Sequence, residues 1–200
     1  MKRTHPILLA VAFLAIFNQS YGQNSDLKVS KSSEMSISGT STLHSWTCNV
    51  TDVSGTVKVD EKILKKGEFK KGDKIAAVSI TVPVLSIKSE RGETMEQKMY
   101  NALKYEENPN ITFSLTDNQI TSPGKETFAV EAKGNLTIAG KTKAITLPVA
   151  GKRDASGKYS FEGSYKLNMK DYDMEPPTAM FGQIVTGEEV EISFKLIVED

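Results

Sequence analysis

The chain has 200 residues and carries 25 Lys and Arg against 25 Asp and Glu, so its formal net charge at pH 7 is zero. This balance argues against nucleic acid as a partner, because nucleic-acid binding needs a basic face. The single cysteine, Cys48, excludes an internal disulfide. Its thiol is either buried or available for pairing between chains, and we expect burial.

The N-terminal segment, residues 1–22, has the pattern of a secretory signal peptide. Lys2 and Arg3 precede an apolar run over residues 7–17, and the small residues Ser20 and Gly22 stand at the two positions that a signal peptidase reads. We therefore expect cleavage after Gly22 and export of the protein. The apolar run is shorter than the roughly 20 residues that a spanning helix needs. A membrane-anchored N-terminus is the alternative.

Strand-like alternation dominates the rest of the chain. Residues 23–34 are polar and serine-rich, which predicts a flexible lead-in to a folded domain over residues 35–200. Beyond them, apolar residues recur at every second position, the signature of strands with one buried face. Such alternation covers residues 53–59, 78–84, 111–115, 128–138, 145–149, 159–169 and 190–198.

One segment has helical spacing instead. Met95, Met99, Ala102 and Leu103 lie on one face of a predicted short helix. With a further strand over residues 37–50, the pattern predicts an all-β domain of about eight antiparallel strands and one short α-helix. Eight strands of this length can close into a barrel or split into a sandwich, and periodicity alone does not choose between them.

The strand over residues 37–50 holds three rare side chains at alternate positions, His44, Trp46 and Cys48. His44 and Cys48 would lie roughly 13 Å apart along one strand, too far to share a metal ion. No nucleophile elbow and no phosphate-binding loop accompanies them. We therefore expect no catalytic residue, no metal site and no cofactor. An exported enzyme that uses buried carboxylates or tyrosines is the alternative.

Four sequence blocks resemble one known family. They are "GTSTLHSWT" (39–47), "MEQKMYNALKYEENPNITFSL" (95–115), "GNLTIAGKTKAITLPV" (134–149) and "PPTAMFGQIVTGEEVEISFKL" (176–196). In this order they resemble the YceI-like family of exported polyisoprenoid-binding proteins. The resemblance implies a lipocalin-like antiparallel barrel with a long isoprenoid lipid in its apolar pore, and a periplasmic or secreted location.

Together these observations predict non-catalytic binding, sequestration or transport of a long-chain isoprenoid or other apolar lipid. The expected partner is that lipid; the protein would be a monomer or homodimer and not an integral membrane protein. An exported structural or stress-related module with a side-chain-filled barrel is the alternative. The candidate lining is the inward set Val78, Ile80, Val82, Phe113, Phe128, Val130, Leu136, Ile138, Phe161, Tyr165, Met169, Met174 and Phe181.

Two side chains of the 37–50 strand, Trp46 and Cys48, are expected in the core or the lining. His44 is polar and must find a hydrogen bond if it is buried. It either bonds to a neighbouring strand or contacts a lipid head group. Met95 and Met99 on the helix either cover one end of the barrel or belong to its core.

Overall fold

The computed structural model describes residues 23–199, so the expected signal peptide lies outside the described residues. The strands are β1 (Asn24–Val29), β2 (Glu34–Ser41), β3 (Ser45–Val50), β4 (Ser54–Asp60), β5 (Ile75–Pro83), β6 (Ile87–Ser89), β7 (Asn110–Ser122), β8 (Thr127–Ile138), β9 (Lys141–Arg153), β10 (Tyr159–Asn168), β11 (Thr178–Ala179) and β12 (Ile184–Glu199). The α-helices are α1 (Glu61–Lys66) and α2 (Glu93–Ala102), and the 3-10 helices are η1 (Val84–Ser86) and η2 (Met169–Tyr172).

Eight of these strands close into a barrel. Their order is β1-β4-β5-β7-β8-β9-β10-β12, and β12 pairs back onto β1 through Lys28 opposite Glu199 and Val29 opposite Val198. Each of these pairings is antiparallel. The expected eight-stranded, lipocalin-like antiparallel barrel is therefore confirmed.

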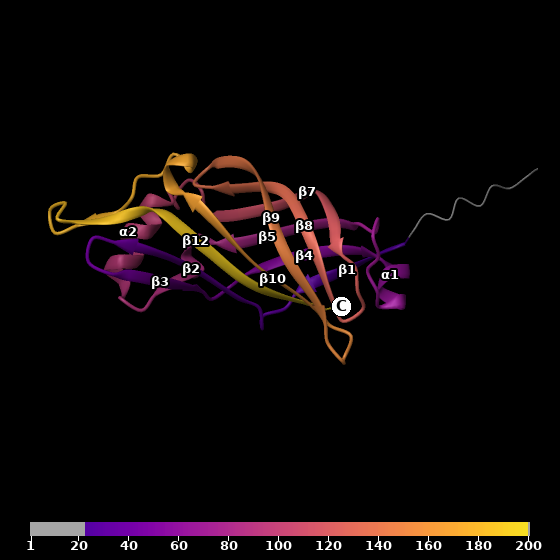
Figure 1. Cartoon of the computed structure of the whole chain (residues 1–200). Coiled ribbons are helices and arrows are strands. Elements are labelled where there is room, and N and C mark those ends of the chain that lie inside the picture. Colours follow the sequence, from indigo (N-terminus) through magenta and orange to yellow (C-terminus); the bar gives the residue numbers. More distant parts are fainter. Residues whose placement is uncertain (1–22, 200) are drawn as a thin grey trace, which may run out of the picture.

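The sheet continues beyond the closed barrel on one side. Strand β12 pairs with β10 along one edge, and with β1 and then β2 along the other. Strands β3 and β6 extend the sheet from β2. Figure 1 shows the resulting elongated molecule, with β12 running along its length, α1 near one end and α2 near the other. We call the α1 end the closed end and the α2 end the open end.

The alternation read from the sequence matches the burial in the structure. In β8, Phe128, Val130, Ala132, Gly134, Leu136 and Ile138 are buried, while the residues that alternate with them are more exposed. Such alternation places one face of each strand toward the interior of the barrel. The expected helix is also confirmed, because α2 contains Met95, Met99 and Ala102 and has Leu103 as its C-cap.

The structure corrects the expected lead-in over residues 23–34. Residues 24–29 form β1, which pairs with β4 on one side and with β12 on the other. The following serine-rich turn is ordered as well: the Ser33 hydroxyl accepts a hydrogen bond from the Ile197 N–H at 2.9 Å. Only Leu27 is buried in β1. The strand was missed because one buried side chain leaves no visible alternation.

A second α-helix, which the sequence pattern did not predict, covers the closed end. The carboxylate of Asp60 accepts a hydrogen bond from the Lys62 N–H at 2.7 Å and so caps α1 at its N-terminus. The loop after α1 places Phe69 in the barrel, where its ring stacks on Phe128 with centroids 4.1 Å apart. Tyr159 meets the Phe69 ring edge-on at 6.0 Å. These rings fill the closed end.

We predict that truncating Leu27 destabilises the protein as a core substitution does. Leu27→Ala should lower the free energy of unfolding by about 2–5 kcal/mol, because it empties a buried position in a strand that closes the barrel. Lys28→Ala, on the outward face of the same strand, should change it by less than about 0.5 kcal/mol. Urea unfolding measures both variants. Equal small effects would contradict β1 as a barrel strand.

Candidate functional site

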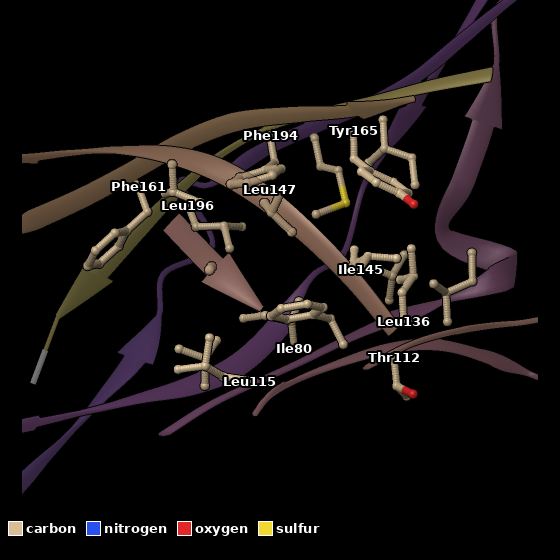
Figure 2. A pocket seen from close by; sticks show the side chains of 18 of the residues that line it. Ile80, Thr112, Leu115, Leu136, Ile145, Leu147, Phe161, Tyr165, Phe194 and Leu196 are labelled. Carbon is tan, nitrogen blue, oxygen red and sulfur yellow. The ribbon is translucent and has the colours of Figure 1, made fainter. Parts of the chain in front are cut away.

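An apolar chamber of about 150 Å³ lies inside the barrel. Its walls come from β4, β5, β7, β8, β9, β10 and β12 of the barrel and from β2 and β3. Figure 2 shows lining side chains of β5, β7, β8, β9, β10 and β12. Thr112 and Tyr165 are the only lining residues whose side chains carry an oxygen or nitrogen atom. An apolar cavity of this kind stays dry and accepts apolar guests. We call it the inner chamber.

Two glycines in the wall make room for aromatic rings of the inner chamber. A Cβ atom at Gly134 would lie 2.4 Å from the Phe113 ring, and one at Gly163 would lie 2.8 Å from the Phe194 ring. The rings therefore lie against the backbone of neighbouring strands, a close approach that only glycine permits. This arrangement keeps two large side chains near the wall and leaves the middle of the barrel open.

A second chamber of about 340 Å³, the outer chamber, lies at the open end. It shares Ile37, Ile111 and Ile192 with the inner chamber, so the two linings are continuous. Its walls combine apolar side chains of α2, η2 and β12 with polar groups, among them the cations Arg91 and Lys98. Neither chamber has an Asp or Glu in its lining. The site is apolar in depth and polar toward the open end.

A polar cluster under α2 holds this helix, one wall of the outer chamber, against β6. The buried carboxylate of Glu96 accepts hydrogen bonds from Lys88 Nζ at 3.0 Å and from the Ser89 N–H at 3.1 Å. The Tyr100 hydroxyl accepts from Lys88 Nζ at 3.0 Å and donates to the Ile87 carbonyl oxygen at 2.9 Å. The Lys88 ammonium, with help from the Ser89 N–H, holds the pKa of Glu96 below its usual range.

Residues 23–199 contain no group of three or more His, Cys, Asp or Glu side chains that could hold a metal ion. In the same part of the chain, no helix has the length and apolar character needed to cross a membrane.

The sequence matches the family model described as the YceI-like domain over residues 26–198. The chain belongs to the YceI-like domain family. The resemblance of the four sequence blocks is thereby confirmed. A search among curated proteins finds no match.

Three solved structures illustrate the likeness in fold. Burkholderia cenocepacia BcnA superposes with a TM-score of 0.61 at 19% identity, covering 82% of this chain and 95% of that one. A polyisoprenoid-binding domain from Saccharophagus degradans, implicated in plant cell wall breakdown, gives 0.66 at 12% identity, covering 88% and 99%. A Campylobacter jejuni YceI protein gives 0.56 at 20% identity, covering 76% and 84%. At these identities the likeness shows the fold alone.

Most of the candidate lining residues of this YceI-like chain lie at the two chambers. Those that line the inner chamber are Val78, Ile80, Val82, Phe113, Val130, Leu136, Phe161 and Tyr165. Those that line the outer chamber are Ile138, Met169 and Met174. Met95 and Met99 also line the outer chamber from α2. The structure thus brings these residues together along one path through the YceI-like barrel.

Two candidates lie elsewhere and need correction. Phe128 is buried in the closed end against Phe69, below the inner chamber, because a loop side chain fills that end of the barrel. Phe181 does not point inward at all: its relative exposure is 110%, at the turn between β11 and β12. Phe181 lies in a turn, outside the segments of alternating residues, so no strand pleat directs its side chain inward.

The rare side chains of the 37–50 segment have three different environments. Cys48 is fully buried, as expected, and burial raises the pKa of its thiol. Trp46 lines the outer chamber, and its Nε1–H donates to the Thr40 carbonyl oxygen at 3.0 Å. His44 also lines the outer chamber but is exposed, and its Nδ1 lies 3.5 Å from the Ser41 hydroxyl.

The candidate set omitted several residues of the YceI-like chambers. Ile145, Leu147 and Val149 of β9 and the inward residues of β12 line the inner chamber. Their alternation was visible in the sequence and could have placed them. No comparable pattern marks Arg91 and Lys98, because only the docking of α2 brings these two cations to the outer chamber.

We predict that the stability of the protein depends on pH through the carboxylate of Glu96. Its folded pKa is lowered, so its contribution to stability is present above the ordinary value of about 4.3 and is lost as the pH falls through the folded pKa. Glu96→Gln should therefore be less stable than wild type at about pH 6, and the difference should shrink toward about pH 3. Urea unfolding against pH measures it. The exposed Glu107→Gln serves as control, and a constant difference for Glu96→Gln would contradict the assignment.

We also predict that His44 contributes little to the stability of this YceI-like fold. The ring is exposed and its contact with Ser41 is at the limit of hydrogen-bond length. His44→Ala should change the free energy of unfolding by less than about 0.5 kcal/mol. A loss near the cost of a buried hydrogen-bond partner, about 1–3 kcal/mol, would instead support a structural role.

Proposed function

We propose that the protein binds a long apolar lipid of the polyisoprenoid type without transforming it, and so sequesters or carries that lipid. The observation that carries this proposal is the inner chamber, a dry apolar space continuous with a second chamber that opens toward the molecular end. A barrel filled by its own side chains would lack such a space.

The energetics favour a chain-like apolar guest. Each CH₂-sized unit moved from water to an apolar site contributes about 0.8 kcal/mol, so ten units contribute roughly 8 kcal/mol. Part of this free energy is lost to the immobilisation of the ligand. The Thr112 and Tyr165 hydroxyls are the only polar side-chain groups of the inner lining, so recognition there depends on shape and burial.

The two linings favour one orientation of the lipid. We infer that the apolar chain occupies the inner chamber and that the polar end stays in the outer chamber, near Arg91, Lys98 and the hydroxyls of Ser41 and Thr94. The reverse orientation would bury a polar group among hydrocarbon side chains, at a cost of several kcal/mol.

The absence of carboxylates from both linings supports binding rather than catalysis. A general acid or base must reach the reacting group directly or through one water molecule, and no Asp, Glu, His or Lys among residues 23–199 lines the inner chamber, where the apolar chain would lie. The polyisoprenoid-binding description of the Saccharophagus domain, which shares the fold, agrees with the same class of ligand.

We further propose that residues 1–22 are a signal peptide removed after Gly22 and that the protein acts in the periplasm or outside the cell. The support is the basic, apolar and small-residue pattern of the segment. N-terminal sequencing of the protein purified from its native host tests the cleavage site; a mature N-terminus other than Gln23 would contradict it.

Two measurements test the proposed binding. Extraction of the purified protein with organic solvent, followed by mass spectrometry, should release a prenyl lipid. Titration with a prenyl alcohol should change the fluorescence of Trp46, the only tryptophan, because it lines the outer chamber. A protein that releases no lipid and gives no response to added prenyl chains would contradict the proposal.

We predict that filling the inner chamber abolishes lipid binding. Ala132→Phe places a ring in the chamber, whereas Ala144→Phe places the same ring on the exposed face of the neighbouring strand β9. The first variant should weaken binding at least about tenfold, since it occupies the volume of several CH₂ units, and the second should leave it unchanged. Overpacking costs about 1–3 kcal/mol, so thermal unfolding should confirm that Ala132→Phe still folds. Unchanged binding by Ala132→Phe would exclude the inner chamber.

A further inference from the structure

Exposed apolar side chains gather at the open end of the molecule. Among residues 23–199, five large hydrophobic side chains are strongly exposed, and four of them belong to two turns. Leu43, with a relative exposure of 68%, lies in the β2–β3 turn, and Met180, Phe181 and Val185, at 64%, 110% and 41%, lie in or beside the β11–β12 turn. We call these four residues the apolar tip.

The two turns of the apolar tip are bound to each other. The Thr42 N–H donates to the Val185 carbonyl oxygen at 3.0 Å, and the Val185 N–H donates to the Thr42 hydroxyl at 3.3 Å. Figure 1 shows both turns projecting at the end of the molecule where α2 lies. The tip is therefore one surface built from two distant parts of the sequence.

The backbone of the second turn directs Phe181 away from the protein. Met180, Phe181 and Gly182 have φ angles of 51°, 55° and 86°, a left-handed run that side chains other than glycine rarely adopt. The ring of Phe181 is fully exposed, so packing of this ring inside the protein does not explain the left-handed conformation. The turn presents an aromatic side chain to the surroundings of the protein.

The tip is also free of formal charge. Residues 35–51 and 176–187 contain no Asp, Glu, Lys or Arg, in a chain of which 25% is charged. Such a surface enters an apolar phase without the cost of transferring an ion. The apolar tip borders the outer chamber directly, because Ser41 and His44 of the first turn and Ala179 and Ile184 of the second line that chamber.

Two cationic side chains lie next to the apolar tip, in the lining of the outer chamber. Arg91 and Lys98 line the outer chamber, and Lys98 Nζ donates to the Thr178 carbonyl oxygen of β11 at 2.6 Å. Neither forms an ion pair with a carboxylate of residues 23–199, although Glu90 and Glu93 flank Arg91 in the sequence. An uncharged apolar edge backed by cations matches the layers of a membrane surface, with acyl chains below anionic head groups.

We propose that the apolar tip docks on the surface of a lipid bilayer and places the mouth of the outer chamber against it. Leu43, Met180, Phe181 and Val185 enter the acyl boundary, and Arg91 and Lys98 face anionic phosphate groups. The choice of a bilayer as the partner rests on the proposed function, because a long apolar lipid resides in a membrane. Docking would let the apolar chain of the lipid pass from the bilayer into the barrel without contact with water.

Vesicle flotation tests the docking. The chain beginning at Gln23 is used, because the apolar run over residues 7–17 would bind vesicles by itself, and the closed barrel and both cores are formed within residues 23–199. The vesicles contain phosphatidylethanolamine and phosphatidylglycerol at about three to one. Phe181→Asp should lower the partition coefficient at least about tenfold, because it places a charge in the acyl boundary.

The matched control is Leu85→Asp, which alters the fifth exposed hydrophobic side chain, 52% exposed on η1 and outside the tip. It should leave the partition coefficient within about twofold of wild type. Arg91→Gln should weaken binding to these vesicles but not to vesicles of phosphatidylcholine. Failure of the wild-type chain to float, or equal losses for Phe181→Asp and Leu85→Asp, would overturn the proposal. The proposal would also be overturned if the wild-type chain formed a dimer that does not float and if Phe181→Asp dissociated that dimer.

A separate readout distinguishes docking from the proposed function. Phe181→Asp should bind a prenyl alcohol delivered in solution as wild type does, measured by Trp46 fluorescence, because Phe181 does not line either chamber. Flotation that depends on Phe181 without any binding of the prenyl alcohol would support docking while contradicting the proposed lipid binding. Binding of the prenyl alcohol without flotation would contradict docking alone.

Discussion

The structure depends on the hydrogen bonding of β12 along both of its edges. On one edge this strand pairs with β10, and on the other with β1 and then β2. Because β12 pairs back onto β1, neither strand is a free edge there, and the sheet encloses an interior lined by apolar side chains. Between β1 and β2 the ladder is kept by Ser33, whose side chain bonds to the Ile197 N–H in place of a backbone group. The inner chamber lies inside the barrel that this closure forms.

The two ends of the molecule differ in packing: the closed end is filled by side chains, and the open end contains a cavity. At the closed end, Phe69 from a loop stacks on Phe128 and fills the space between the strands. At the open end, α2 is held aside by Lys88 and the buried carboxylate of Glu96, so that the space between helix and strands persists as the outer chamber. The same alternating strands therefore bound a solid core at one end and a cavity at the other. The hydrogen-bonded ion pair of Lys88 and Glu96 under α2 thus keeps the outer chamber open.

The cavity and the apolar tip form one apolar route. The inner lining is hydrocarbon, the outer lining adds cations and hydroxyls, and the tip beyond it carries no charge. The hydrocarbon lining suits the apolar chain of an amphiphile, and the cations and hydroxyls suit its polar head. The uncharged tip suits the acyl boundary of a bilayer. Gly134 and Gly163 contribute by letting two aromatic rings lie against the wall, so bulk is present without blocking the interior.

The sequence by itself determined which residues face inward along the long strands, because the pleat alternates side chains and Phe161, Leu136 and Ile80 obey that alternation. It also determined the family, through four blocks distributed between residues 39 and 196. Only the tertiary structure decided that residues 24–29 are a strand, since their order comes from partners on both sides. It likewise decided the different fates of Phe128 and Phe181, one packed on a loop side chain and one exposed at a turn. Local periodicity tells which face of a strand is apolar, but whether that face meets a side chain, a cavity or solvent depends on what distant segments bring to it.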